Sequence, residues 1–122
     1  IADGPPGIGC AVISSMVEVD LIVLVTEPSL SGFHDLQRVY QLMQLRGIKG
    51  MVIINKWDLN PNISQEIENW ALNNGLPLAG KIPFSNIIVQ SIAQAEIPAT
   101  NPVIRKMLFP LWENIIEQLT VV

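Results

Sequence analysis

The sequence predicts an α/β domain, a partial Rossmann-like, three-layer αβα arrangement around a parallel sheet of about four strands. Short, continuous apolar runs rich in branched side chains recur along the chain, which is typical of strands covered on both faces. Apolar residues spaced three and four apart fill the segments between these runs and indicate helices. Because strand and helix alternate over all 122 residues, we expect a single unit with right-handed crossovers.

Four segments are expected to form the strands. Residues 21–26 and 51–55 are the clearest apolar runs, and 77–82 form a weaker one. The opening residues 1–3 are expected to be the end of a further strand. Polar or turn residues follow each segment, and open parallel sheets bind ligands outside the carboxyl ends of their strands. The turns after the four strands should therefore converge on one site.

The first expected helix follows Ser31 and Gly32 and ends at Gly47, because glycine commonly occupies the left-handed position after a helix. Either Ser29 or Ser31 can cap its first turn, and Asp35 suits that turn electrostatically. The second helix follows Asn62 and ends at Gly75, and a short third helix covers about 86–95. The buried face of this third helix is expected to include Ile88 and Ile92.

The last helix begins at Asn101 and Pro102, which match an N-cap followed by proline at the first helical position. Pro110 lies inside this helix and should kink it or split it in two. Its expected apolar face comprises Ile104, Leu108, Leu111, Trp112, Ile115 and Leu119.

Composition narrows the function classes. A net charge of −4, with only seven Lys and Arg and no basic run, argues against direct nucleic-acid binding. No apolar run approaches the ~20 residues that a transmembrane helix needs. The single cysteine, Cys10, excludes an internal disulfide and fits a reducing, cytoplasmic compartment. Because Ile1 directly precedes a turn, we expect the chain to begin inside a larger domain.

The turn Asp3-Gly4-Pro5-Pro6-Gly7 is the first candidate for chemistry. A carboxylate at a strand end, here Asp3, can hold a Mg²⁺-bound water beside a triphosphate. Gly7 lacks a Cβ, so its N–H can approach a terminal phosphate closely. The alternative is a turn that only closes a strand.

The segment Asn55-Lys56-Trp57-Asp58 is the second candidate. The amide of Asn55 at a strand end can both donate to and accept from a purine edge. Asp58 can accept paired N–H groups from a guanine, and the stem of Lys56 can cover a face of the ring. The alternative is an Asx-type turn with a solvated Asp58.

His34 and Cys10 are weaker candidates. His34 is the only histidine and has no ligand cluster near it in the sequence, so capping and packing are favoured over catalysis. Cys10 can be a small apolar side chain at a helix start, or a thiolate that serves as a redox group or ligand. One cysteine cannot complete a cluster site, so such a site would be shared between two subunits.

These motifs occur together, in the order typical of a known family. They resemble the C-terminal half of MinD/ParA/Mrp-type P-loop ATPases, in particular the MinD-like ATPases that carry an inserted ferredoxin domain. The resemblance covers nearly the whole chain and is carried by the runs DGPPGIGC at 3–10, VTEP at 25–28 with Ser31, Gly32 and Asp35, INKWDLN at 54–60, and GKIPF at 80–84.

The resemblance implies roles for the matching positions. Asp3 would be the Walker B aspartate, acting on Mg²⁺ through water, and Gly7 would belong to the loop that senses the γ-phosphate. Asn55 would contact the purine, and Pro83 and Phe84 would line the base pocket. The family further implies binding and hydrolysis of ATP, with Mg²⁺, by a homodimer that holds nucleotides at its interface.

The phosphate-binding loop of such a domain does not occur in these residues, nor do ferredoxin cysteines. We therefore expect the chain to need a missing N-terminal half and to be inactive alone. In this family the P-loop strand lies between the Asp3 strand and the strand at 21–26. We expect that gap to be closed by a shifted strand, a second chain or the missing half. An iron–sulfur cluster with Cys10 as a ligand, and a link to electron-transfer chemistry, are further expectations for the full-length protein.

Two other functions stay open at this point. A GTPase of the metal-chaperone or signal-recognition class would read guanine through Asn55 and Asp58. A non-catalytic interaction or dimerisation module would carry only half of a nucleotide pocket. The relative affinity for ATP and GTP, and hydrolysis by the chain alone, would separate these functions from an ATPase.

Overall fold

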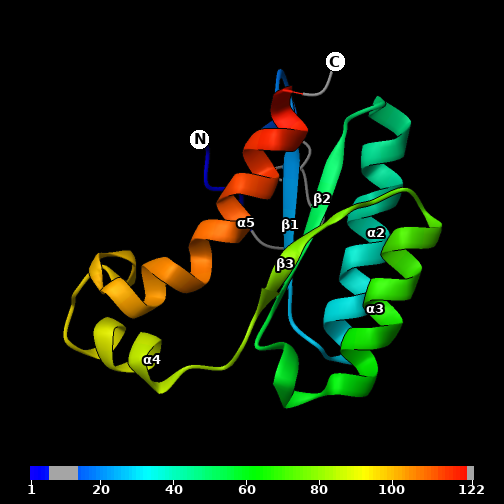
Figure 1. The fold of residues 1–122 in the computed structure, drawn as a ribbon. Coiled ribbons are helices and arrows are strands. Elements are labelled where there is room, and N and C mark those ends of the chain that lie inside the picture. Colours follow the sequence, from blue (N-terminus) through cyan, green and yellow to red (C-terminus); the bar gives the residue numbers. More distant parts are fainter. Residues whose placement is uncertain (6–13, 121–122) are drawn as a thin grey trace.

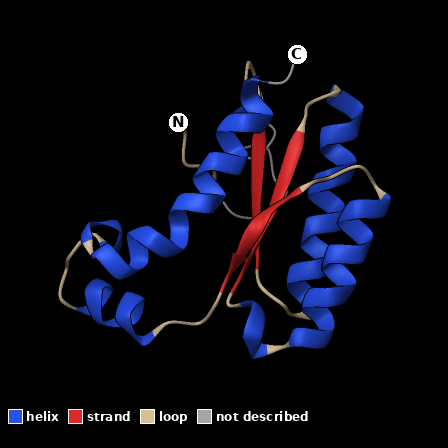
Figure 2. Cartoon of the chain, viewed as in Figure 1, coloured by secondary structure: helices blue, strands red, loops and turns tan. Residues whose placement is uncertain are grey.

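The computed structural model describes residues 1–5 and 14–120, and these contain one parallel sheet (Figures 1 and 2). Its strands are β1 (Ile22–Thr26), β2 (Gly50–Asn55) and β3 (Leu78–Ile82), in the order β1-β2-β3. Each strand closely matches a predicted segment. The α/β class and the parallel sheet are therefore confirmed.

Helices cover both faces of the sheet and give the three expected layers (Figure 1). α2 (Leu30–Arg46) and α3 (Pro61–Asn73) lie on one face, and α5 (Pro102–Thr120) lies on the other. α4 (Asn86–Ala93) lies apart from the sheet, beside the short 3₁₀ turn Pro98–Thr100. None of the helices in the described ranges is long and apolar enough to cross a bilayer.

The central strand β2 fills both cores. Val52 and Ile54 are fully buried and lie in the core that α2 and α3 share. Met51 and Ile53 lie in the core beneath α5. Because successive side chains of a strand point to opposite faces, one continuous apolar run supplies both cores, as predicted. The first core contains Met16, Leu36, Met43, Val52, Ile54, Ile67, Ala71 and Leu76, and the second contains Met51, Ile53, Ala79 and Leu111.

The ends of α2 follow the expected signals with one change. Ser29 is the N-cap, and its Oγ accepts a hydrogen bond from the N–H of Gly32 at 3.0 Å. The helix begins directly after Ser29, earlier than predicted, so Asp35 lies beyond its first turn. Gly47 ends the helix in the left-handed region, with a φ of 65°.

α5 begins where the sequence indicates, and α3 begins at Pro61, before the predicted start after Asn62. The Asn60 Oδ1 accepts a hydrogen bond from the N–H of Ile63 at 3.1 Å and caps α3. The Asn101 Oδ1 accepts one from the N–H of Val103 at 2.9 Å, directly before α5. α5 continues through Pro110 as one helix, and its ribbon bends part-way along (Figure 1). Of the two predicted outcomes, a kink without a split is therefore the one observed.

Some of the predicted buried faces are wrong. Ile92 of α4 is 63% exposed, because α4 does not pack on the sheet. Trp112 and Leu119 of α5 are 46% and 47% exposed. Within the sheet, α5 packs mainly against the edge strand β3, so only the stripe that includes Leu111 is covered. The apolar face of α5 is therefore wider than the part of it that the described residues cover.

The strand expected at residues 1–3 is not formed. Residues 1–5 have no regular secondary structure, and all five are exposed. A strand needs a neighbour for its backbone hydrogen bonds, and no described strand pairs with this segment. β1 is consequently an edge strand in the described part of the chain, and Val25 is 64% exposed. No strand among the described residues has shifted to fill the predicted gap.

Candidate functional site at the carboxyl edge of the sheet

Three loops meet at the carboxyl edge of the sheet. The register pairs Thr26 with Ile54, and Asn55 with Ile82, so the three strands end at nearly the same level. The loops that follow β1, β2 and β3 leave the sheet at its lower end in Figure 1. An ion pair and a hydrogen bond connect these loops to one another. The predicted convergence is therefore seen for three of the four turns.

The loop after β1 packs closely against Gly32 in the first turn of α2. A Cβ placed on Gly32 would lie 2.7 Å from the carbonyl oxygen of Glu27 and 2.9 Å from the Oγ of Ser29, so a larger residue would displace the loop. The Glu27 Oε1 lies 3.0 Å from the Lys56 Nζ, which ties this loop to the next one. Both groups are partly exposed, so the pair contributes about 0.2–1 kcal/mol.

A left-handed residue, a 3₁₀ turn and a buried hydrogen bond define the conformation of the loop after β2. Lys56 has φ 54° and ψ 40°, a left-handed conformation that costs a non-glycine residue about 1–2 kcal/mol. A single 3₁₀ turn, Trp57–Leu59, follows it. The buried hydroxyl of Ser64 donates a hydrogen bond to the carbonyl oxygen of Trp57 at 2.7 Å. These features hold the turn in place beside the last residue of β2.

Asn55 is that last residue, and its side chain is unpaired. It is half-buried and makes no side-chain hydrogen bond to any residue of the chain that the structure describes. The strand that precedes it is buried along its whole length. A side-chain amide carries two donors and an acceptor. Asn55 therefore offers both kinds of group to a ligand at this edge.

Asp58 joins the loop after β2 to the loop after β3. Its Oδ1 accepts a hydrogen bond from the backbone N–H of Phe84 at 2.7 Å, a length typical of charge-assisted bonds. Phe84 is 42% exposed, and Pro83 beside it is half-buried. The residues predicted to contact a purine thus lie on two loops that touch. Sequence reasoning gave Asp58 a role toward the base and did not foresee this contact with the backbone.

Lys81 adds a contact that the motifs did not reveal. Its Nζ lies 5.0 Å from the centroid of the Trp57 ring and 3.4 Å from the Glu68 Oε2. The register places Lys81 opposite Ile54, which brings it beside the loop after β2. A cation over an indole contributes about 0.5–1 kcal/mol at an exposed site. Lys81 belongs to the run GKIPF, but its contact with Trp57 depends on the register of β2 and β3.

Asp3, the candidate for the Mg²⁺-bound water, is not brought to this edge. Asp3 lies in the exposed segment 1–5, and the N-terminus in Figure 1 is drawn away from the loops that follow the strands. Gly7 and Cys10 lie outside the described residues, so their roles stay predictions. Within the described residues, no group of three or more His, Cys, Asp or Glu is arranged to hold a metal ion.

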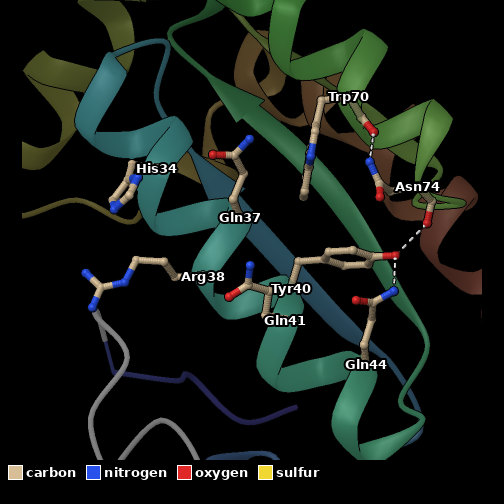
Figure 3. Close-up of a pocket in the computed structure, with 8 residues that line it drawn as sticks. All are labelled: His34, Gln37, Arg38, Tyr40, Gln41, Gln44, Trp70 and Asn74. Carbon is tan, nitrogen blue, oxygen red and sulfur yellow. Dashed lines mark hydrogen bonds between the residues drawn. The ribbon is translucent and has the colours of Figure 1, made fainter.

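A polar groove of about 360 Å³ lies on the outer side of α2 and α3 and, of the candidate residues, includes only His34 (Figure 3). The Tyr40 hydroxyl donates a hydrogen bond to the Asn74 carbonyl at 2.9 Å and accepts one from the Gln44 Nε2 at 2.8 Å. The Trp70 ring stands edge-on to Tyr40, with centroids 5.2 Å apart. The packing of the two helices accounts for this groove. His34 lies on its rim and is exposed.

No protein-family model matches the chain. The chain is 35% identical over 60 residues to an uncharacterised protein, MJ0578, of Methanocaldococcus jannaschii. It is 26% identical over 102 residues to a putative septum site-determining protein MinD of Chlorella vulgaris. Its structure superposes on the cell division ATPase MinD of Pyrococcus furiosus with a TM-score of 0.75 and 19% identity, over 95% of this chain and 50% of that one. The chain has the fold of half a MinD-type ATPase.

The MinD-type fold agrees with the resemblance and the fold class that the motifs predicted. The two sequence matches cover 49% and 79% of this chain. The chain spans 22% of the length of the Methanocaldococcus protein and 36% of the Chlorella MinD. The structural match, at 19% identity, concerns the fold. In that fold, the loops after β1, β2 and β3 form the carboxyl edge of the sheet, where α/β proteins bind ligands.

Proposed function

We propose that this chain supplies the base-binding side of an ATP site in a MinD/ParA-like P-loop ATPase. The site is the carboxyl edge formed by the loops after the three strands. Asn55 would contact the purine edge, Pro83 and Phe84 would line the base pocket, and the stem of Lys56 would cover a face of the ring. Hydrolysis would belong to the whole protein, because a backbone cradle for the phosphates supplies most of the catalysis in this class.

The unpaired amide of Asn55 is the observation that carries this proposal. No buried polar side-chain atom lacks a hydrogen-bond partner in the described part of the chain, so the unpaired groups of the Asn55 amide are open to solvent and accessible to a ligand. Asn55 is half-buried at the end of a buried strand and has no partner within the described residues. The loops on either side of it are already connected by an ion pair and a hydrogen bond. A pocket whose walls are held before binding loses less conformational entropy when the ligand arrives.

The phosphate side of the proposed site rests on the resemblance. Asp3 stays the candidate for the Mg²⁺-bound water, and Gly7 the candidate for the γ-phosphate. We further propose that ATP binding is coupled to homodimerisation, so that hydrolysis switches the protein between two states of assembly. A link to iron–sulfur chemistry would need Cys10 from two subunits, because a single cysteine cannot hold a cluster.

A second candidate function is an interaction module without catalysis. The outer edge of β1 has no partner strand within the described residues. Apolar side chains on α5 are also exposed, among them Phe109 at 55%, Trp112 at 46% and Ile116 at 40%. Unpaired strand edges and apolar patches are typical of surfaces that another chain covers.

Titration of the full-length protein with a fluorescent ATP analogue tests the proposal. We expect Asn55→Ala to weaken ATP binding about tenfold, because a lost hydrogen-bonding group costs about 1–2 kcal/mol. Asn73→Ala removes an exposed amide at the end of α3 and is the matched control, which should bind as the wild type does. Equal affinity of Asn55→Ala and the wild type would contradict the base contact. A wild-type protein that self-associates but binds no ATP would favour the interaction module.

Competition by GTP in the same titration tests the guanine alternative. A guanine presents two N–H groups to a carboxylate, whose two oxygens together offer about four lone-pair sites. One oxygen of Asp58 already accepts the N–H of Phe84. ATP as the nucleotide rests on the MinD-like resemblance, and much tighter binding of GTP than of ATP would contradict it.

A further inference from the structure

The Asp58–Phe84 contact connects two loops that are 26 residues apart in the sequence. The donor is a backbone N–H and the acceptor is a side-chain carboxylate, at 2.7 Å. Both residues are exposed, so the packing of the core does not place the carboxylate there. Asp58 makes no other side-chain hydrogen bond or ion pair within the described part of the chain.

The contact lies directly beyond the ends of β2 and β3. The register pairs Asn55 with Ile82, and Phe84 is two residues further along. Asp58 belongs to the 3₁₀ turn Trp57–Leu59, which the Ser64 hydroxyl holds through its hydrogen bond to the Trp57 carbonyl oxygen. The carboxylate therefore connects the loop after β3, which has no regular secondary structure, to a turn that a second hydrogen bond already holds. A charge-assisted hydrogen bond is about twice as strong as a neutral one, which suits this task.

We propose that Asp58 is a positioning residue: its carboxylate holds the Phe84 loop beside Asn55 and thereby sets the shape of the base pocket, without itself reading the base. The inference rests on the proposed function for the identity of the ligand, an adenine nucleotide. The motif Asn55-Lys56-Trp57-Asp58 thus has the sequence pattern of a guanine-binding segment, but its aspartate binds a backbone N–H of the protein itself.

Three variants separate positioning from base reading. Asp58→Asn keeps an oxygen that can accept the N–H of Phe84, but its NH₂ group cannot accept from a guanine. Asp58→Ala removes both abilities. Asp20→Ala removes an exposed carboxylate directly before β1, at the opposite end of the sheet, and is the matched control.

The first experiment needs no nucleotide. Amide hydrogen exchange at Phe84 is followed by NMR in the full-length wild type and the three variants. We expect Asp58→Ala to accelerate this exchange about tenfold, because the amide loses its acceptor. Asp58→Asn should retain most of the protection, and Asp20→Ala should match the wild type. Unchanged exchange at Phe84 in Asp58→Ala would overturn the proposal.

The second experiment measures the affinities of the same proteins for ATP and GTP. We expect Asp58→Ala to weaken ATP binding about three- to tenfold through the displaced Phe84 loop, and Asp58→Asn to bind ATP nearly as the wild type does. Loss of GTP binding alone, in both variants, would show that Asp58 reads guanine and would overturn the proposal. If the wild type binds neither nucleotide, the proposed function fails, and the exchange at Phe84 still decides whether Asp58 holds this loop.

Discussion

The proposed base side and the proposed phosphate side of the candidate site are built very differently. On the base side, the loops follow a buried central strand and are joined by an ion pair and a hydrogen bond. On the phosphate side, Asp3 lies in a segment, residues 1–5, in which every residue is exposed. The geometry of the base side is therefore a property of this chain's own fold. The placement of Asp3 depends on what packs against residues 1–5.

Substitutions in β2 and in the opening segment should show this difference most strongly. Ile54 is fully buried beneath the base side, and Ile54→Ala should lower the free energy of unfolding by about 3 kcal/mol through lost burial and a cavity. Asp3→Ala should change it by less than about 0.5 kcal/mol, because the residue is exposed. Urea denaturation measures both values. A large loss of stability in Asp3→Ala would show that residues 1–5 are packed into the fold.

Two glycines give a second, smaller contrast. In Gly32→Ala, the new Cβ would meet the Glu27 carbonyl at 2.7 Å, and we expect a loss of about 1–2 kcal/mol despite the higher helix propensity of alanine. In Gly4→Ala, the nearest atom is the Ser15 Oγ at 3.8 Å, an ordinary contact, so stability should stay the same. Thermal denaturation of the pair checks this. Equal melting temperatures would mean that the loop after β1 can move away from α2 without cost.

The Lys81 contact should have the smallest effect. Lys81→Met removes the cation beside the Trp57 ring and the ion pair with Glu68, and we expect a loss of at most about 1 kcal/mol because the groups are partly exposed. Lys106→Met, at an exposed position of α5, is the control and should be neutral. Chemical denaturation of both variants gives the difference. A loss well above this value would indicate that Lys81 organises the loop after β2.

The strands and helices could be predicted because their signals are local. The run Met51-Val52-Ile53-Ile54 predicts a strand buried on both faces, and it supplies both cores. Gly47 and Asn101 mark helix ends whose hydrogen bonds involve only near neighbours. Burial of α4 and α5 could not be predicted as well. An apolar helix face such as the one that includes Trp112 predicts burial against another element. Only the tertiary structure shows whether this chain supplies that element.

The candidate site was predictable in its location and less so in its contacts. Turns that follow parallel strands must share an edge, and this rule placed Asn55 and Phe84 together. The hydrogen bond between Asp58 and Phe84 depends on the register of β2 and β3, which has an irregularity near Val52 and Ile53. No local pattern encodes such a register. The motif therefore predicted that Asp58 lies at this edge of the sheet, but it did not predict the hydrogen bond to Phe84.

A crystal structure of the full-length protein with bound ADP tests the central claim most directly. The account predicts a purine within hydrogen-bonding distance of the Asn55 amide, about 3 Å, and next to Phe84. It also predicts that the Asp58–Phe84 hydrogen bond is still present in that complex. A purine bound away from the loops after β2 and β3, or a base that displaces Phe84 from the Asp58 carboxylate, would contradict it.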